Sequence, residues 1–262
     1  MKTQPLAQKY GPYALVAGGS YGLGAAFAEQ IADSGLNLVI LARNKDALNA
    51  TAARIRETYG VDVIAIAVDL ANFDAVKKQV LALKVDIGLL IYDAAYAPIG
   101  PFAETTEEQL ATAAAVNVKA PLLLTKLLST SMIERGRGGI VLMSSLAGGQ
   151  GSPNLATYAA TKAFNTILAE GLWKELTPLG LDVLVCTAGA ILTPGYEQAE
   201  SSKPAPGTLS ASAVASQTLA ALGKGPVVVP GPVNKLGRFM MTRLLSRRAA
   251  IGIMAKNTEG LS

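Results

Sequence analysis

The chain of 262 residues contains no histidine and a single cysteine, Cys186. The absence of histidine excludes Ser-His-Asp hydrolysis, histidine-ligated zinc and imidazole proton shuttles. One cysteine cannot build a disulfide framework, and no Cys/His cluster is available for structural zinc. Aromatic residues make up only 5% of the chain, and the net charge of +4 is too small to indicate a nucleic-acid partner. Any catalytic chemistry must therefore come from other side chains, without a metal site.

Long apolar segments are also missing. No run reaches eighteen consecutive apolar residues, so no transmembrane segment is expected. The beginning of the chain, MKTQPLAQKYGPYALVAGG, lacks the apolar stretch of a secretory signal. Half of the residues are hydrophobic, which suffices for one large core. These features predict a single cytoplasmic domain over residues 1–262.

Short apolar runs alternate with longer segments of helical periodicity. Seven runs predict strands, because they are apolar on both faces as parallel strands covered by helices are: 13–17, 38–41, 63–68, 87–91, 139–143, 181–186 and 227–229. Six helices are predicted near 23–34, 45–58, 73–82, 106–131, 156–177 and 210–222. The alternation predicts an α/β fold, a Rossmann-type doubly wound parallel sheet of about seven strands with helices on both faces. Ligands then bind at the carboxyl ends of the strands.

A glycine-rich turn, AGGSYGLG at 17–24, follows the first predicted strand and opens the first predicted helix. Its spacing is GxxxGxG, not the commoner GxGxxG. Glycines allow the backbone to approach a pyrophosphate closely, and the helix N-terminus offers free N–H groups. A purely structural turn is the alternative, but the position between strand and helix favours phosphate binding. The predicted contacts are Gly18, Ser20, Tyr21, Gly22, Leu23 and Gly24.

The ends of the second and third strands indicate which dinucleotide binds. Ala42 stands where NAD-binding folds usually place an acid for the ribose 2′-hydroxyl, and Arg43 follows it. A guanidinium binds a 2′-phosphate through charge-assisted hydrogen bonds, so NADP is favoured over NAD, the alternative being a solvated Arg43. Asp69 and Leu70 are candidates for the adenine side, although Asp69 could instead cap the following helix.

Four polar residues form a candidate catalytic group. Tyr158 and Lys162 are four residues apart in a predicted helix, which places them on one face. The ammonium would stabilise the phenolate, so that Tyr158 could deliver or remove a hydroxyl proton. Ser145 could bind the substrate oxygen, and the buried amide of Asn117 could hold a water that leads to Lys162. A YxxxK pair alone is often a solvated pair, but this set in this order after the glycine turn is far more specific.

On these motifs the chain resembles the short-chain dehydrogenase/reductase family over about residues 11–230. The TGxxxGxG loop of the family corresponds to AGGSYGLG, its Ser to Ser145 in VLMSSLAG, and its YxxxK to Tyr158 and Lys162. The resemblance implies that Tyr158 is the acid/base and that Lys162 binds the nicotinamide ribose and favours the phenolate. It also implies that Ser145 polarises the carbonyl and that Asn117 holds a water of the proton relay. Arg43 after Ala42 resembles the NADP-preferring members.

Some positions depart from the family pattern. Ala17 replaces a threonine, and the NNAG motif after the fourth strand reads Tyr92-Asp93-Ala94-Ala95. The PG motif after the sixth strand reads Ala188-Gly189. The resemblance places Ala94 on the adenosine side, and Ile191 and Thr193 beside the carboxamide and phosphates. None of these changes removes a catalytic group, so they bear on cofactor affinity.

The implied function is an NADP-dependent oxidoreductase that interconverts a ketone or aldehyde and an alcohol. A β-ketoacyl thioester reductase of fatty-acid or polyketide type is the alternative on the same core. A non-catalytic NADP-binding regulator and a membrane-surface protein are the less favoured classes. The candidate substrate contacts are mostly apolar and predict a small-molecule substrate with an apolar portion: Tyr96, Leu146, Ala147, Gln150 and the segment 190–209.

Two further segments and the two longest helices lead to predictions about substrate access, membrane contact and assembly. The Pro-, Gly- and Ser-rich segment 193–209 predicts a substrate lid or a mobile insertion. The tail 232–262 starts with a basic amphipathic helix over 232–250, whose apolar stripe could lie on an anionic membrane or, as we favour, cover the substrate cleft. Helices 106–131 and 156–177 carry more apolar surface than one sheet face covers, which predicts a homodimer or homotetramer.

Overall fold

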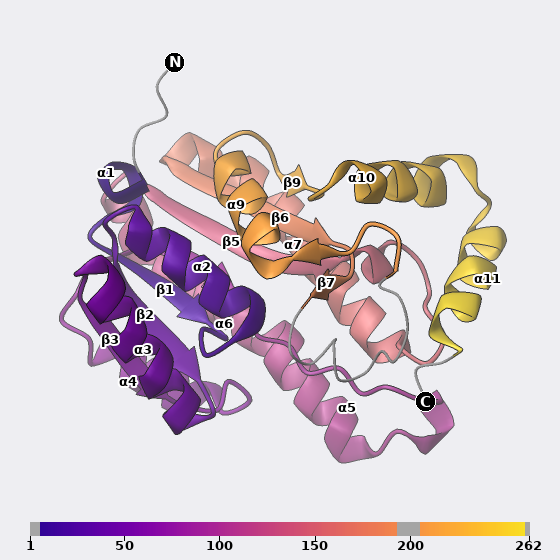
Figure 1. Cartoon of the computed structure of the whole chain (residues 1–262), viewed down its shortest axis with the longest axis horizontal. Helices are drawn as coiled ribbons and strands as arrows, with labels where there is room; N and C mark the ends of the chain where they lie inside the picture. The colour runs from indigo at the N-terminus through magenta and orange to yellow at the C-terminus, as the bar shows by residue number, and fades with distance from the viewer. Residues whose placement is uncertain (1–5, 193–204, 260–262) are drawn as a thin grey trace.

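The computed structural model describes residues 6–192 and 205–259 (Figure 1). Its main sheet has seven parallel strands in the order β3-β2-β1-β4-β5-β6-β9. The strands are β1 (Tyr13–Ala17), β2 (Asn37–Ala42), β3 (Val63–Ala67), β4 (Ile87–Tyr92), β5 (Gly138–Ser145), β6 (Leu181–Ala188) and β9 (Val227–Val228). The predicted doubly wound α/β fold is confirmed, with every predicted strand present and its ends displaced by two residues at most.

The helices follow the predicted order, with an additional short helix at the start, α1, and two divided helices. They are α1 (Leu6–Tyr10), α2 (Gly22–Asp33), α3 (Lys45–Tyr59), α4 (Phe73–Leu81), α5 (Glu107–Ala114), α6 (Ala120–Glu134), α7 (Ala156–Leu176), α9 (Ala211–Ala221), α10 (Pro232–Phe239) and α11 (Arg247–Thr258). The predicted helix 106–131 is α5 and α6 joined by a π-turn, Ala115–Lys119. The predicted tail helix 232–250 is divided into α10, a π-turn (Met240–Leu244) and α11. Ser246 starts α11, because its side chain accepts the N–H of Ala249.

Two hydrophobic layers hold the helices on the sheet. On one face, α2, α3 and α9 pack on strand side chains such as Val16 and Ile40. On the other face, α4, α6 and α7 pack on the alternate strand residues, such as Leu15 and Leu41. Successive side chains of a strand point to opposite faces, so strands that are apolar throughout must be covered on both. Figure 1 shows α2 and α9 together over one face of the sheet.

The long helical run Glu107–Glu134 is unusually apolar. Among the described residues it is the one helix long and apolar enough to cross a membrane, with a mean hydropathy of 1.2. Its side chains Leu124, Leu128 and Met132 are buried in the core beneath the sheet. Packing in this layer covers only part of its apolar surface, since Leu122 of the same run is 41% exposed.

Of the segment 193–209 only residues 205–209 are described, and 193–204 lie outside the described residues. Leu209 and Ser210 form a short strand, β8 (Leu209–Ser210), parallel to β7 (Ile191–Leu192). The N–H of Leu209 also donates to the carbonyl of Ala190 at 3.1 Å. This two-stranded sheet, which the sequence did not predict, places Leu209 and Ser210 beside Ile191 and Leu192, the residues that follow β6.

Candidate active site

A cavity of about 680 Å³ lies at the carboxyl ends of the central strands. The strand order reverses between β1 and β4, and in such sheets this point opens a ligand-binding crevice. The cavity wall brings together thirteen of the predicted residues: Gly18, Ser20, Tyr21, Gly22, Leu23, Arg43, Asp69, Leu70, Ala94, Ser145, Tyr158, Lys162 and Ile191. Gly24 and Asn117 are buried and do not line the cavity, and Thr193 is outside the described residues.

The glycine turn has the geometry that a pyrophosphate needs. Gly18 and Gly22 have φ of 98° and 62°, in the left-handed region that favours glycine. A Cβ atom at Gly24 would lie 2.1 Å from the carbonyl oxygen of Gly18, so this position has no room for a side chain. Helix α2 begins at Gly22, and the Tyr21 side chain makes no capping bond to its first N–H groups. The Asp93 carboxylate accepts the N–H of Gly24, whereas the N–H groups of Gly22 and Leu23 have no partner among the described residues. These two groups can meet an anion at the helix N-terminus, and the residues present fit a dinucleotide.

The residues predicted to bind the adenosine half line the same cavity. Ala42 is buried and contributes no carboxylate, while Arg43 is exposed, with no acidic partner among the residues that the structure describes. Asp69 does not cap helix α4. Its carboxylate accepts the N–H of Ala71 at 3.0 Å within a turn, and Asn72 is the N-cap instead.

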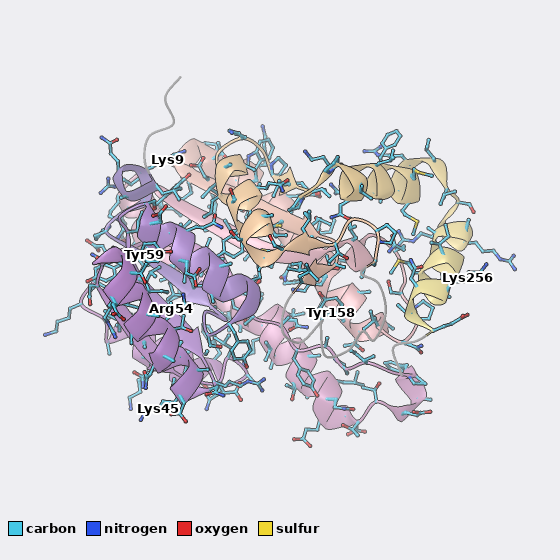
Figure 2. The ribbon with its side chains drawn as sticks, in the orientation of Figure 1. Lys9, Lys45, Arg54, Tyr59, Tyr158 and Lys256 are labelled. Atoms are coloured by element: carbon cyan, nitrogen blue, oxygen red, sulfur yellow. The ribbon has the colours of Figure 1, made fainter. Side chains whose placement is uncertain are left out.

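Tyr158 and Lys162 lie on the first turns of α7, as their spacing predicted. The Lys162 ammonium is 5.5 Å from the centre of the Tyr158 ring and donates to the carbonyl oxygen of Met143 at 3.0 Å. Only 4% of Lys162 is exposed, so its position is set by the protein rather than by solvent. Tyr158 is half-buried, and Figure 2 shows it in the middle of the molecule, where α7 begins. A fixed positive charge thus stands beside the phenol.

Ser144 and Ser145 end strand β5 and have different partners. The Ser144 hydroxyl donates to the carbonyl of Lys162 at 2.8 Å and contacts the hydroxyl of Thr166, which ties β5 to α7. Ser145 accepts the N–H of Ala147 at 3.2 Å. Its own hydroxyl hydrogen has no acceptor within the described ranges. Ser145 therefore remains able to donate a hydrogen bond to an oxygen in the cavity.

Asn117 lies in the π-turn between α5 and α6, and its amide is fully bonded by the protein. Its Oδ1 accepts the N–H of Tyr96 at 2.8 Å, and its Nδ2 donates to the carbonyl of Tyr96 at 2.7 Å and to Thr161 at 3.1 Å. These bonds satisfy the buried amide without a water, and the role of Asn117 in a proton relay stays a prediction. Asn117 ties the segment after β4 to α7, one residue before Lys162.

Asp93 replaces the usual asparagine and is a half-buried carboxylic acid in the cavity wall. Burial raises the pKa of Asp93 to about 6, against the opposing effects of the Lys162 charge and a hydrogen bond from the N–H of Gly24. The unfolded chain has the ordinary value of 3.8, so between about pH 4 and pH 6 the unfolded state binds fewer protons than the folded state. The stabilisation that Asp93 contributes to the folded state is therefore fully present below about pH 4, and it is lost as the pH rises from about 4 to about 6.

Asp93→Asn should therefore raise the free energy of unfolding at about pH 8 by about 3 kcal/mol, because the amide has no charge to desolvate. The gain should shrink as the pH falls through about 6 and disappear near pH 4. Denaturant unfolding at several pH values measures this difference. Asp33→Asn, at an exposed carboxylate, is the matched control. A gain that does not change between pH 4 and 8 would contradict the assignment.

Other parts of the cavity wall were not predicted as contacts: Ala42, Asp93, Ala95, Ile99, Val116, Met143, Ser144, Ala188 and Gly189. Most of them stand at or just after the ends of β2, β4, β5 and β6, so the rule that ligands bind at strand ends could have identified them. Of the predicted substrate contacts, Tyr96 lines this cavity. Gln150 does not: it is buried, donates to the carbonyl of Leu146, and lines a second cavity with Arg247. Leu146 and Ala147 are also absent from the wall of the main cavity.

The predicted orientation of the tail was wrong. Its stripe was expected to cover the cleft, but Leu236, Phe239, Met240 and Leu244 are 44–65% exposed. Asn234 is the buried side chain of α10, and Arg247 bonds the carbonyl of Gly149. The helix is thus attached to the protein by polar contacts, which leave its apolar side outward.

Proteins with related sequences are named as dehydrogenases or reductases. A 7beta-hydroxysteroid dehydrogenase of Collinsella aerofaciens is 34% identical over 190 residues, which cover 72% of each chain. A very-long-chain 3-oxoacyl-CoA reductase of Laccaria bicolor is 35% identical over 173 residues, or 64% of this chain. The match spans about half of that reductase, 51% of its length.

Solved structures with the same fold cover almost the whole chain. A structure from a study of 7beta-hydroxysteroid dehydrogenase stereoselectivity has a TM-score of 0.90 and 30% identity, and the match covers 96% of this chain and 99% of the other. A short-chain dehydrogenase from Sphingobium yanoikuyae in complex with NADPH has a TM-score of 0.79 and 30% identity, with 93% and 95% covered. The family model for short chain dehydrogenases matches residues 12–204. The glycine turn, Ser145, Tyr158 and Lys162 all lie in that range, and the chain belongs to the short chain dehydrogenase family.

Proposed function

We propose that the protein is an NADP-dependent oxidoreductase that interconverts a ketone or aldehyde and an alcohol. The observation that carries the proposal is one cavity whose wall holds the glycine turn at one end and Ser145, Tyr158 and Lys162 at the other. The glycine turn would hold the pyrophosphate of a dinucleotide in the same cavity as these side chains. The names of the relatives, a hydroxysteroid dehydrogenase and an oxoacyl-CoA reductase, support the same reaction class.

The bound nicotinamide supplies or accepts the hydride, and the chain supplies position, charge and a proton. Ser145 donates a hydrogen bond to the substrate oxygen and holds it near the phenol. Tyr158 gives its proton to that oxygen in the direction of reduction and takes it back in the direction of oxidation. Lys162, fixed by the carbonyl of Met143, stabilises the phenolate that remains. Asn117 keeps the segment at Tyr96 in place beside the reacting groups.

A β-ketoacyl thioester reductase is the second candidate, because the same catalytic group serves both substrates and a 3-oxoacyl-CoA reductase is among the relatives. A panel of ketosteroids, simple bulky ketones and 3-oxoacyl thioesters, followed by NADPH consumption, distinguishes the two. Reduction of thioesters alone would select the second candidate. Tight NADPH binding without turnover on any carbonyl would contradict both and favour a non-catalytic NADP-binding protein.

The cofactor preference rests on Arg43, which is exposed at the cavity and follows a position without a carboxylate. We expect NADPH to bind at least about tenfold tighter than NADH, since the guanidinium pairs with the 2′-phosphate. Arg43→Ala should weaken NADPH binding by about 1–3 kcal/mol and leave NADH binding nearly unchanged. Titration of both cofactors against both proteins measures the effect. Equal affinities in the unmodified protein would refute an NADP preference.

We also propose a homodimer or homotetramer. Leu122 of α6 and Ile167 of α7 are 41% and 68% exposed, and a two-fold interface through these helices would cover both. Light scattering at micromolar concentration should give a multiple of the 27.0 kDa chain mass. A monomer mass would reject the assembly.

A further inference from the structure

Helix α10 and the π-turn that continues it, residues 232–244, are amphipathic. Unlike a usual surface helix, they turn a polar side toward the protein and an apolar side toward solvent. The inward side chain is Asn234, which is 5% exposed. Its Nδ2 donates to the carbonyls of Gly207 and Pro230 at 3.0 and 2.9 Å. Because buried amides keep such bonds, they fix the rotation of α10 about its axis. The opposite side of the helix must then face away from the protein.

Five large apolar side chains lie on this outward side, and we call them the apolar ridge. They are Val233, Leu236, Phe239, Met240 and Leu244, with exposed fractions of 53%, 61%, 53%, 44% and 65%. Their spacing repeats every three or four residues, as in one face of a helix. Figure 1 shows α10 at the upper edge of the molecule, beyond the end of the main sheet. A contiguous apolar surface of this kind marks an interaction site.

The surroundings of the ridge are basic. Lys235 and Arg243 are exposed beside it on the same helix, and Arg248 and Lys256 belong to α11. Figure 2 shows Lys256 pointing away from the protein. Residues 205–258 contain seven of the 23 Lys and Arg residues and none of the 19 Asp and Glu residues. The rest of the chain is therefore net negative, and the positive charge is concentrated around the ridge.

We propose that the apolar ridge and its basic border bind the surface of an anionic lipid bilayer. Helix α10 lies in the interface, the ridge enters the acyl-chain boundary, and Lys235 and Arg243 reach the phosphate headgroups. A two-fold contact with a second copy fits less well, because it sets the patch against itself. In such a dimer, Lys235 and Arg243 of one chain would lie near the same basic residues of the other chain. Neither α10 nor α11 contains an acidic residue that could pair with them.

Sedimentation of the full chain with vesicles tests the proposal. The protein should bind vesicles of phosphatidylglycerol and phosphatidylcholine, bind pure phosphatidylcholine much less, and dissociate as salt is added. Leu236→Glu/Leu244→Glu should lower the binding constant about tenfold or more, because two ridge side chains leave the acyl region. Lys235→Glu/Arg243→Glu should lower it by a similar factor and weaken its salt dependence.

Leu81→Glu is the matched control, since Leu81 is 62% exposed on α4, outside the ridge. It should bind vesicles as the unmodified protein does. Thermal unfolding and NADPH binding show that each variant is folded, and neither measurement depends on the substrate. The proposal is overturned if the unmodified protein does not bind anionic vesicles, or if Leu81→Glu lowers vesicle binding as much as the ridge variant does. If the unmodified protein forms an oligomer in solution and Leu236→Glu/Leu244→Glu dissociates it, the ridge binds a second copy of the chain, and the membrane proposal is overturned.

Discussion

Tyr158→Phe should lower kcat by about 10²–10⁴-fold, because the group that transfers the proton is removed. The phenol oxygen makes no hydrogen bond to the described part of the chain, so its loss leaves no buried partner unsatisfied. The ring keeps its place at 5.5 Å from the Lys162 ammonium. Steady-state reduction of the best substrate from the carbonyl panel, together with an NADPH titration, measures both consequences.

The NADPH dissociation constant and the thermal unfolding temperature of this variant should match those of the unmodified protein. Lys162→Ala provides a contrast, because it should weaken both turnover and NADPH binding. It removes a buried charge and a bond to the carbonyl of Met143. Substantial turnover by folded Tyr158→Phe would show that another group is the acid.

Gly24→Ala should raise the NADPH dissociation constant about tenfold to a hundredfold, the effect of losing one hydrogen bond to a charged phosphate. The added Cβ would stand 2.1 Å from the Gly18 oxygen and 3.1 Å from a carboxylate oxygen of Asp93. Backbone atoms cannot turn away as a flexible side chain does, so the turn or the start of α2 must move. Calorimetric or fluorescence titration with NADPH gives the constant directly.

Gly252→Ala is the matched control, because it lies in α11 and an added Cβ there meets nothing within 4 Å. It should leave NADPH binding unchanged and raise helix stability slightly. Unchanged NADPH binding by Gly24→Ala would mean that the glycine turn does not hold the cofactor.

The strands and most helices could be predicted because their causes are local. Fully apolar strands must be covered on both faces, and side chains such as Asn44 and Asn72 start helices by accepting the N–H of Ala47 and Ala75. The glycine turn could be predicted for the same reason, since its position between a strand and a helix is visible in the sequence. The spacing of Tyr158 and Lys162 likewise places both on one helix face without further information.

Features that depend on distant residues could not be predicted. The π-turn at Asn117 is stabilised by bonds to Tyr96 and Thr161, and the pKa of Asp93 depends on burial by several elements. The tail shows the difference most clearly. Its sequence determined an amphipathic, basic helix, but periodicity does not state which side faces the protein. The bonds of Asn234 to Gly207 and Pro230, residues brought near only by the fold, decided that the apolar side faces outward.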